Sequence, residues 1–375
     1  MLFAFIATSY TMQNFTPIDQ WYSDLHKPLI IAGPCSAESE QQVLQTAIAL
    51  AKTGQVAALR AGVWKPRTRP GGFEGAGVEA LRWLQRAKRE TELRICTEVA
   101  LPEHVRLAVE HGVDMVWIGA RTAANPFSID MLAAELAKAN IPVLVKNPVT
   151  PDLDLWIGAI ERLARANVHK LAAVHRGFYP YAQSHRRNIP KWEIPIDLRS
   201  RIPQLPIIGD PSHIAGRANL VAEVAQHALN LSFDGLMVEV HPSPTEALSD
   251  ARQQLSLSDF AAMLNNLRFP SPSSTDSNYI NLIEQARSSI DSIDTQILEL
   301  LSNRMRLIEQ IGRCKRSNNV TVVQQQRWER IRESRTELGK KLGLREDYIS
   351  NLLELVHKES IKRQAEIIKS NDDQA

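Results

Sequence analysis

A loop that follows a hydrophobic run carries three cations between two prolines. Residues 56–63 are apolar enough to form a buried parallel strand, and Gly and Pro punctuate the segment after it. Lys65, Arg67 and Arg69 lie on this loop. Cations at the end of a strand favour an anionic, phosphate-bearing substrate. Taken alone, such a tripeptide is more typical of a solvated basic turn, so the interpretation depends on whether the same layout recurs.

The layout does recur after other apolar runs. Polar residues close or follow these runs at Cys35, Arg60, Lys65, Glu98, Arg121, Lys146, His175, Arg176, His213, Glu239 and His241. Any one of them is as easily a structural polar group that is satisfied inside the fold. All of them together are hard to explain in that way, so we expect them to share one site.

Four of the candidate residues combine a thiol, an imidazole and two carboxylates. Cys35 follows a Gly-Pro turn, His213 follows Asp-Pro-Ser, Glu239 ends an apolar run and Asp250 comes shortly after it. A mixed set of sulfur, nitrogen and oxygen ligands suits Mn, Fe, Co or Zn. The spacing is no local metal motif, and the alternative is that Cys35 is a small buried hydrophobe and Asp250 a helix N-terminal residue.

Alternating elements must position these residues. Apolar runs predict strands at 29–33, 56–63, 94–100, 115–120, 142–147, 171–177, 206–212 and 235–240. Amphipathic segments predict helices at 38–52, 78–89, 102–111, 129–138, 153–165 and 218–231. This alternation predicts an α/β fold, a (β/α)8 TIM barrel, in which catalytic groups stand at the carboxyl ends of the strands. No Gly-x-Gly-x-x-Gly opens a helix, which argues against a dinucleotide site.

The composition narrows the function classes. With 375 residues, 44% hydrophobic and 23% charged, the chain is expected to be globular with one large and one small domain. A net charge of +2 gives no reason to expect nucleic acid or a membrane as partner. Three widely spaced cysteines favour a reducing cytoplasm over a disulfide framework. The apolar start lacks the features of a signal peptide, and Met12 offers an alternative start.

The composition changes after Phe260. Residues 265–278 are rich in Ser, Pro and Asn, as in a linker. Beyond them, apolar spacing predicts three helices at 280–315, 325–338 and 345–369. Because one long helix cannot bury its own apolar stripe in so small a unit, we expect an all-α domain that forms a homodimer. The predicted boundaries are an arm at 1–27, the barrel at 28–264, a linker at 265–278, a helical domain at 279–370 and a tail at 371–375.

Seven motifs of the predicted barrel carry a family resemblance. They are GPCS (33–36), RAGVWKPRT (60–68), IGAR (118–121), VKNP (145–148), HRGF (175–178), DPSHIAGR (210–217) and MVEVH (237–241). In this order they resemble the 3-deoxy-D-arabino-heptulosonate 7-phosphate (DAHP) synthases of the short type I barrel form. That family condenses phosphoenolpyruvate with erythrose 4-phosphate, the first step of the shikimate pathway to aromatic amino acids.

The resemblance implies a role for each motif residue. The implied ligands of a divalent metal, which would polarise the aldehyde of erythrose 4-phosphate, are Cys35, His213, Glu239 and Asp250. The implied phosphoenolpyruvate-binding residues are Arg60, Arg121, Lys146 and Arg176. Those implied for erythrose 4-phosphate are Lys65, Pro66, Arg67 and Thr68. Lys65 is in addition the candidate that donates a proton to the carbonyl oxygen or positions it.

A sister family makes the eight-carbon sugar acid of lipopolysaccharide with the same barrel and the same phosphoenolpyruvate chemistry. It resembles KANRSS where this chain has Lys65-Pro66-Arg67-Thr68, which favours the four-carbon aldose. Arg69 departs from the small residue expected after this motif. Another sugar-phosphate substrate for the barrel is therefore a further alternative.

The C-terminal segment resembles the all-helical, type II chorismate mutases. The resemblance is carried by AR-x-x-I-x-x-ID (286–294), Arg304, GRCK (312–315), QRW (326–328) and ES-x-x-x-Q (359–364). The rearrangement of chorismate to prephenate needs only positioning and electrostatics. By resemblance, Arg304 and the Arg287 of the partner chain would bind the two carboxylates. Lys315 and Gln364 would stabilise charge on the ether oxygen. Arg327 and Ser360 would complete the site. Trp328 departs from the Glu of better-known relatives.

The main hypothesis is therefore a bifunctional enzyme that acts on phosphoenolpyruvate, erythrose 4-phosphate and chorismate. The alternative is that the helical domain is only a dimerisation and regulatory module that binds an effector. A hypothesis on control accompanies both: chorismate or prephenate bound to the helical domain inhibits the synthase.

Overall fold

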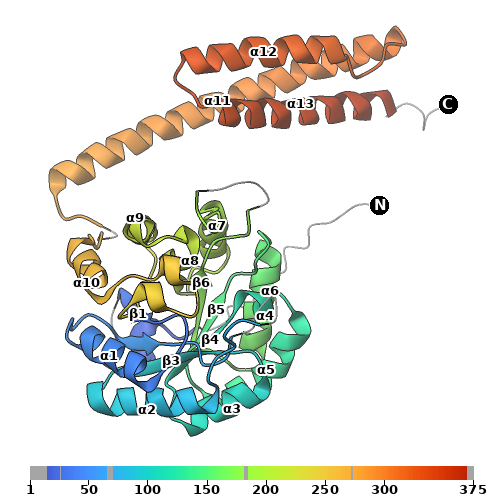
Figure 1. Ribbon diagram of the computed structural model, residues 1–375. Helices are drawn as coiled ribbons and strands as arrows, with labels where there is room; N and C mark the ends of the chain where they lie inside the picture. The colour runs from blue at the N-terminus through green and yellow to red at the C-terminus, as the bar shows by residue number, and fades with distance from the viewer. Residues whose placement is uncertain (1–14, 26, 66–70, 181–184, 272, 370–375) are drawn as a thin grey trace. The chain divides into compact units, whose positions relative to one another are not determined.

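The computed structural model describes residues 15–25, 27–65, 71–180, 185–271 and 273–369 (Figure 1). The chain divides into two units, Met1–Pro272 and Ser273–Ala375. The first unit is an eight-stranded barrel and the second consists of helices.

The strands of the first unit are parallel and close on themselves in the order β1 to β8. They are β1 (Leu29–Gly33), β2 (Ala58–Arg60), β3 (Arg94–Val99), β4 (Met115–Ile118), β5 (Val143–Lys146), β6 (Leu171–His175), β7 (Ile207–Gly209) and β8 (Gly235–Glu239). The barrel is closed by pairing of β1 with β8, from Leu29 opposite Gly235 to Gly33 opposite Glu239. The predicted (β/α)8 barrel is confirmed.

Helices follow the strands and surround them (Figure 1). They are α1 (Glu40–Ala51), α2 (Val78–Thr91), α3 (Pro102–Glu110), α4 (Ala120–Ala123), α5 (Pro126–Ala139), α6 (Leu153–Arg165), α7 (Glu193–Arg201), α8 (Pro211–Ala215), α9 (Ala218–Asn230) and α10 (Leu257–Asn266). The sequence analysis did not predict α7, which is rich in charge and carries Pro195. Proline is tolerated there because it lies in the first turn, where the backbone N–H groups have no intrahelical partner.

Two apolar clusters fill the barrel unit. The larger lies between the strands and the surrounding helices. The smaller takes alternate residues of the strands and therefore lies inside the barrel: Leu29, Ile31, Ala58, Cys96, Met115, Trp117, Leu144, Ala172, Val174, Ile208 and Met237. Ile18, Trp21 and Leu25 belong to the same cluster. Residues 15–25 thus close the amino end of the barrel, so the carboxyl end is left for a site.

The second unit consists of α11 (Ser277–Ser317), α12 (Gln325–Lys341) and α13 (Glu346–Lys369). Asp276 caps α11 by accepting hydrogen bonds from the backbone N–H groups of Asn278 and Tyr279. The 41 residues of α11 extend beyond the other two helices; α13 packs against the C-terminal part of α11, and α12 packs against α13 (Figure 1). The three predicted helices are confirmed. Among the described residues, no helix is long and apolar enough to cross a membrane.

Candidate functional site

The alternation of side chains along each strand brings charged residues to the carboxyl end of the barrel. Successive side chains of a strand point to opposite faces, so every second residue faces the interior. Ala58, Cys96, Leu144 and Met237 face the interior. The charged residues two positions further on are Arg60, Glu98, Lys146 and Glu239. Four strands therefore carry, as their last or next-to-last residue, a charged group that faces one common space.

Three of the predicted metal ligands lie together at this end. Ligand atoms of Cys35, Glu239 and Asp250 are all within 4.8 Å of one another. The Cys35 Sγ atom is 3.5 Å from Asp250 Oδ2. His213 completes the predicted set, because its Nε2 atom is 3.7 Å from Glu239 Oε1 and 3.9 Å from Asp250 Oδ2. One sulfur, one nitrogen and two carboxylates around a small space fit a divalent transition metal.

The His213 ring is oriented by Asp210, which the sequence analysis quoted but gave no role. Asp210 caps α8 by accepting from the His213 backbone N–H at 3.1 Å, and its Oδ2 lies 2.9 Å from His213 Nδ1. Burial lowers the pKa of His213, so the ring is neutral near pH 7. With Nδ1 donating to Asp210, Nε2 is the free acceptor, which is the form that ligates a metal.

A tight turn holds Cys35 against β2. The φ angle of Gly33 is +147°, and a Cβ atom at this position would lie 2.1 Å from the Arg60 carbonyl oxygen. Only glycine fits this turn. The Cys35 backbone N–H then donates to Gln254 Oε1 at 3.0 Å. Burial, aided by the Glu239 carboxylate, raises the pKa of the Cys35 thiol to about 12, so a metal that binds there must displace a proton.

A cavity of about 390 Å³ adjoins the predicted metal ligands. Its lining includes the predicted residues Lys65, Arg121, Lys146, Arg176, His213 and Asp250. The structure thus brings the predicted cations and two of the metal ligands to one space. The excess of positive charge is suited to a small substrate that carries a phosphate and a carboxylate.

Lys65 lies between this cavity and the thiol. Its Nζ atom is 3.0 Å from the Cys35 carbonyl oxygen and 3.1 Å from Cys35 Sγ. Burial by itself lowers the pKa of Lys65, but the neighbouring Cys35, Glu98 and Glu239 groups outweigh it and raise the pKa overall. Lys65 is therefore an ammonium group with a proton to donate.

Other cations of the cavity are fixed by buried partners. Lys146 Nζ lies 2.8 Å from Asp210 Oδ2, and both side chains are buried. Arg176 Nη1 donates to Asn188 Oδ1 at 2.9 Å. Burial lowers the pKa of Arg176 to about 10, which still leaves it charged at neutral pH. These positions are preorganised, because little rotamer freedom remains to be lost on binding.

Arg60 lies deeper than the other predicted anion-binding residues. Only 1% of its side chain is exposed, and its Nη2 atom is 3.2 Å from Glu239 Oε1. Within the described part of the chain, its Nε and Nη1 atoms have no hydrogen-bond partner. Buried guanidinium donors without partners are costly, so they are well suited to receive an anion.

The structure does not place every expected residue at the site. Pro66, Arg67 and Thr68 fall outside the described residues. His175 does not join the others: it is fully buried in an aromatic cluster, with ring centroids 5.1 Å from Trp192 and 5.8 Å from Phe178. The expectation of one shared site is wrong for His175, because its position on β6 faces the helices and not the barrel interior.

The cavity also has members to which the sequence analysis assigned no role. Glu98 lines it and accepts a hydrogen bond from Trp117 Nε1 at 3.1 Å. Arg187 and Asn188 line it from the segment after β6. Glu98 is one of the polar residues that the sequence analysis expects at a shared site, and it stands two residues after the inward Cys96 on β3. No periodic pattern surrounds Arg187, so the sequence offered no signal for it.

In the helical unit, four of the predicted residues lie between α11, α13 and the segment after α11. Arg304 Nη1 donates to Ser360 Oγ at 2.6 Å, and Lys315 Nζ donates to the Val322 carbonyl oxygen at 2.6 Å. Ser360 and Gln364 are buried. The Gln364 Oε1 atom is buried with no partner among the residues described. Burial lowers the pKa values of Arg304 and Lys315.

Two further predicted residues stand apart from that group. Arg287 pairs with Glu284 at 2.8 Å on the surface of α11. It precedes Arg304 by seventeen residues of one helix, which corresponds to about 25 Å. Arg327 is exposed on α12, and the next residue, Trp328, stacks on His357 with ring centroids 3.9 Å apart. One chain therefore does not bring Arg287 to the other predicted mutase residues.

Comparison with known proteins agrees with both units. Residues 21–268 match the DAHP synthetase I family, and residues 286–365 match chorismate mutase type II. The chain is 34% identical over 239 residues to a phospho-2-dehydro-3-deoxyheptonate aldolase of Thermotoga maritima, which covers 64% of this chain and 68% of that protein. It is 28% identical over 280 residues to a 2-dehydro-3-deoxyphosphooctonate aldolase of Nitratidesulfovibrio vulgaris, covering 68% and 96%.

A solved structure gives the same result. The crystal structure of the Thermotoga maritima DAHP synthase superposes with a TM-score of 0.57 at 32% identity, covering 63% of this chain and 67% of that one. A truncated form of that synthase gives 0.56 at 30% identity, covering 63% and 84%. The chain belongs to the DAHP synthetase I family, and its barrel is joined to a C-terminal type II chorismate mutase domain.

Proposed function

We propose that the barrel condenses phosphoenolpyruvate with erythrose 4-phosphate and that the helical unit rearranges chorismate to prephenate. The observation that supports the synthase function is that two features lie next to each other. Ligand atoms of Cys35, Glu239 and Asp250 lie close together with His213 Nε2 beside them, and this group borders a cavity lined by preorganised cations. A metal-dependent carbon–carbon bond formation on phosphorylated substrates needs both.

The reaction balances without a redox partner. Carbon 3 of phosphoenolpyruvate forms a bond to the aldehyde carbon of erythrose 4-phosphate, water adds its oxygen to carbon 2, and inorganic phosphate leaves from carbon 2. The aldehyde oxygen takes up a proton as the new bond forms. A divalent metal bound by the four ligands supplies Lewis-acid polarisation of that aldehyde.

The protein's own groups do the remaining work. Arg121, Lys146 and Arg176 are placed to hold the phosphate and carboxylate of phosphoenolpyruvate, with the two unpaired donors of Arg60 beneath them. Lys65 is protonated and stands 3.1 Å from the thiol ligand, so it is placed to donate the proton that the aldehyde oxygen requires.

The test is phosphate release by the full chain, measured before and after a chelator removes metal. Erythrose 4-phosphate should support release and D-arabinose 5-phosphate should not, and a divalent metal should restore the activity lost to the chelator. Activity with the five-carbon aldose only would assign the barrel to the sister reaction. Unchanged activity after complete metal removal would contradict the role of the ligand set.

For the helical unit, the supporting observation is the buried group around Gln364. A neutral amide with an unpaired oxygen lies beside the Arg304–Ser360 pair. These residues can position a dicarboxylate and stabilise charge on an ether oxygen without a nucleophile or metal. Incubation of the full chain with chorismate should yield prephenate. Binding of chorismate without conversion would favour the alternative, a purely regulatory module.

The same geometry supports a homodimer, which is a further part of the proposal. Arg287 lies about 25 Å along α11 from Arg304, so a second chain must supply it if both bind one substrate. The same stretch of α11 carries Ile290, Ile293 and Ile297, which expose 54%, 54% and 48% of their surfaces. Residues at this spacing lie on one helix face, and a second copy of the chain would cover them.

Control by a later metabolite is the remaining part of this proposal. Chorismate or prephenate bound to the helical unit inhibits the synthase if the two states of the protein bind it with different affinity. Saturating prephenate should then lower the rate of phosphate release. An unchanged rate would exclude this form of control.

A further inference from the structure

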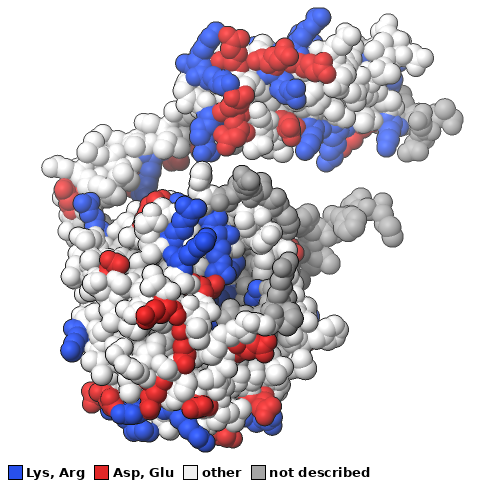
Figure 2. Space-filling view, in the orientation of Figure 1, with Lys and Arg blue, Asp and Glu red and all other residues white. Residues whose placement is uncertain are grey.

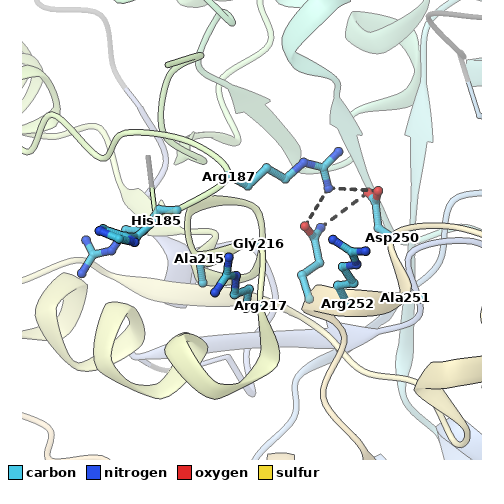
Figure 3. Close-up of a pocket in the computed structure, with 10 residues that line it drawn as sticks. His185, Arg187, Ala215, Gly216, Arg217, Asp250, Ala251 and Arg252 are labelled. Carbon is cyan, nitrogen blue, oxygen red and sulfur yellow. Dashed lines mark hydrogen bonds and ion pairs between the residues drawn. The ribbon is translucent and has the colours of Figure 1, made fainter. Parts of the chain in front are cut away.

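A second hollow, of about 380 Å³, borders the candidate active site. It is lined by the segments that follow β6, β7 and β8, and Asp250 and Arg187 line both this hollow and the cavity described above. Figure 2 shows Lys and Arg side chains gathered around a depression on the barrel unit. Figure 3 shows the residues of the hollow itself. We name it the arginine hollow, after Arg186, Arg187, Arg217 and Arg252.

The cations of the arginine hollow outnumber the anions available to them. Arg186 pairs with Glu223 at 2.7 Å, and Arg187 pairs with Asp250 at 2.9 Å. Asp250, the carboxylate that lines the hollow, is also a predicted metal ligand. Arg217 and Arg252 have no ion pair or hydrogen bond from their side chains to any described residue. Four guanidinium groups against two paired carboxylates, Glu223 and Asp250, leave positive charge for an external anion.

Arg187 is shared between the two spaces. Its contacts with Gln253 Oε1, at 2.6 Å, and with Asp250 Oδ1 both use Nη1 (Figure 3). Its side chain is 42% exposed, so part of the guanidinium group can be reached by a ligand. Because guanidinium donors form a planar fork, one such group can bind two oxygens of a phosphate.

The position of Arg187 depends on a close backbone approach. Gly216 has a φ angle of +69°, and a Cβ atom there would lie 2.3 Å from Arg187 Cβ. The Arg187 backbone N–H donates to the Ala215 carbonyl oxygen at 3.3 Å. The absence of a side chain at Gly216, the residue before Arg217, thus lets the backbone of Arg187 approach this turn.

We propose that the arginine hollow is a second phosphate site, distinct from the cavity that holds phosphoenolpyruvate. Its ligand is a phosphate dianion, free or as the monoester of a small metabolite. If the ligand is free phosphate, its source rests on the proposed function, because that reaction releases inorganic phosphate in the neighbouring cavity. Arg187, which lines both spaces, is then a shared contact along which the phosphate passes from one site to the other.

The test is a titration of the metal-loaded full chain with inorganic phosphate while phosphoenolpyruvate saturates the first cavity. No aldose is present, so no turnover occurs. Arg217→Gln/Arg252→Gln is compared with Arg82→Gln/Arg89→Gln, which removes the same charge from exposed positions of α2. Both pairs of side chains are exposed, so all variants should fold. A second titration uses glycerol 3-phosphate as the probe for a phosphate monoester.

Phosphate should bind to wild type and to the α2 variant in the presence of phosphoenolpyruvate, and about tenfold or more weakly to Arg217→Gln/Arg252→Gln. Tighter binding of glycerol 3-phosphate than of phosphate would identify a phosphate ester as the ligand. Equal phosphate affinity in both variants, or binding that phosphoenolpyruvate abolishes, would overturn the second site. If the chain fails to bind phosphoenolpyruvate, the proposed synthase function is contradicted. The difference in phosphate affinity between the two variants would still test whether the arginine hollow binds phosphate.

Discussion

The barrel and the helical unit hold their functional residues in opposite ways. In the barrel, the Arg60–Glu239 and Lys146–Asp210 pairs are almost completely removed from solvent. In the helical unit, Arg287 exposes 68% of its side chain, and Arg327 is exposed as well. The barrel thus assembles its charged groups within one chain. The helical unit presents an incomplete group and an uncovered apolar face.

This difference predicts which kind of change should reduce the activity of each unit. Removing one partner of a buried ion pair costs roughly 3–5 kcal/mol, because a charge is left without compensation, whereas a surface pair contributes about 0–1 kcal/mol. Single substitutions in the barrel should therefore damage its site directly. In the helical unit, if a second copy completes the site as proposed, its loss should be as damaging as the loss of a side chain.

The largest effect is expected for Cys35→Ala. Loss of this predicted metal ligand should remove several kcal/mol of transition-state stabilisation, which would lower synthase turnover on the order of 10³-fold. Cys96→Ala is the matched control, because Cys96 is an equally buried thiol inside the barrel but lies outside the ligand set. Metal content and phosphate release are measured for both proteins. Equal activity in the two variants would remove Cys35 from the site.

The next effect is expected for Lys315→Gln in the helical unit. If Lys315 stabilises charge on the ether oxygen, its removal should lower the mutase kcat by about 10²- to 10³-fold. Arg313→Gln removes an exposed cation two residues away on α11 and should leave the rate within twofold of wild type. Chorismate consumption is followed by absorbance. A similar loss in both variants would indicate a general charge effect and no specific role for Lys315.

A smaller effect is expected where the apolar face of α11 is altered. Ile293→Glu places a charge on this face, and burying it between two chains would be costly. The variant should sediment as a monomer, and its mutase activity should fall about tenfold or more, with partial recovery at high protein concentration. Gln296→Glu adds the same charge to a polar position of α11. A monomeric Ile293→Glu variant with full mutase activity would show that the site needs only one chain.

The same contrast explains what the sequence could predict. The parallel strands of the barrel are apolar runs, and each charged residue that ends such a run stands out, so Arg60, Lys146 and Glu239 were found. His175 also ends such a run, but the pleat turns it outward, and only the strand register shows this. Arg187 lies in an irregular segment, and its approach to Gly216 depends on a backbone turn that no periodicity indicates.

The smallest expected effect is on the stability of the barrel at acid pH. Burial lowers the pKa of His175 from 6.5 to about 3, so the folded barrel keeps this ring neutral while the unfolded chain takes up a proton near pH 6.5. The unfolded state therefore binds more protons between these values. The stability contributed by the neutral ring is present above pH 6.5 and is lost as the pH falls toward 3.

At pH 5 this amounts to about 2 kcal/mol of the free energy of unfolding. His175→Phe keeps a ring in the aromatic cluster and removes the proton site, so its urea unfolding should lose that much less stability between pH 7 and pH 5 than wild type does. His169 is exposed, so His169→Phe is the control, and its stability should change with pH as that of wild type does. If the stability of His175→Phe falls with pH as steeply as that of wild type, His175 does not cause the acid sensitivity of the barrel, which would then come from the charged groups of its site.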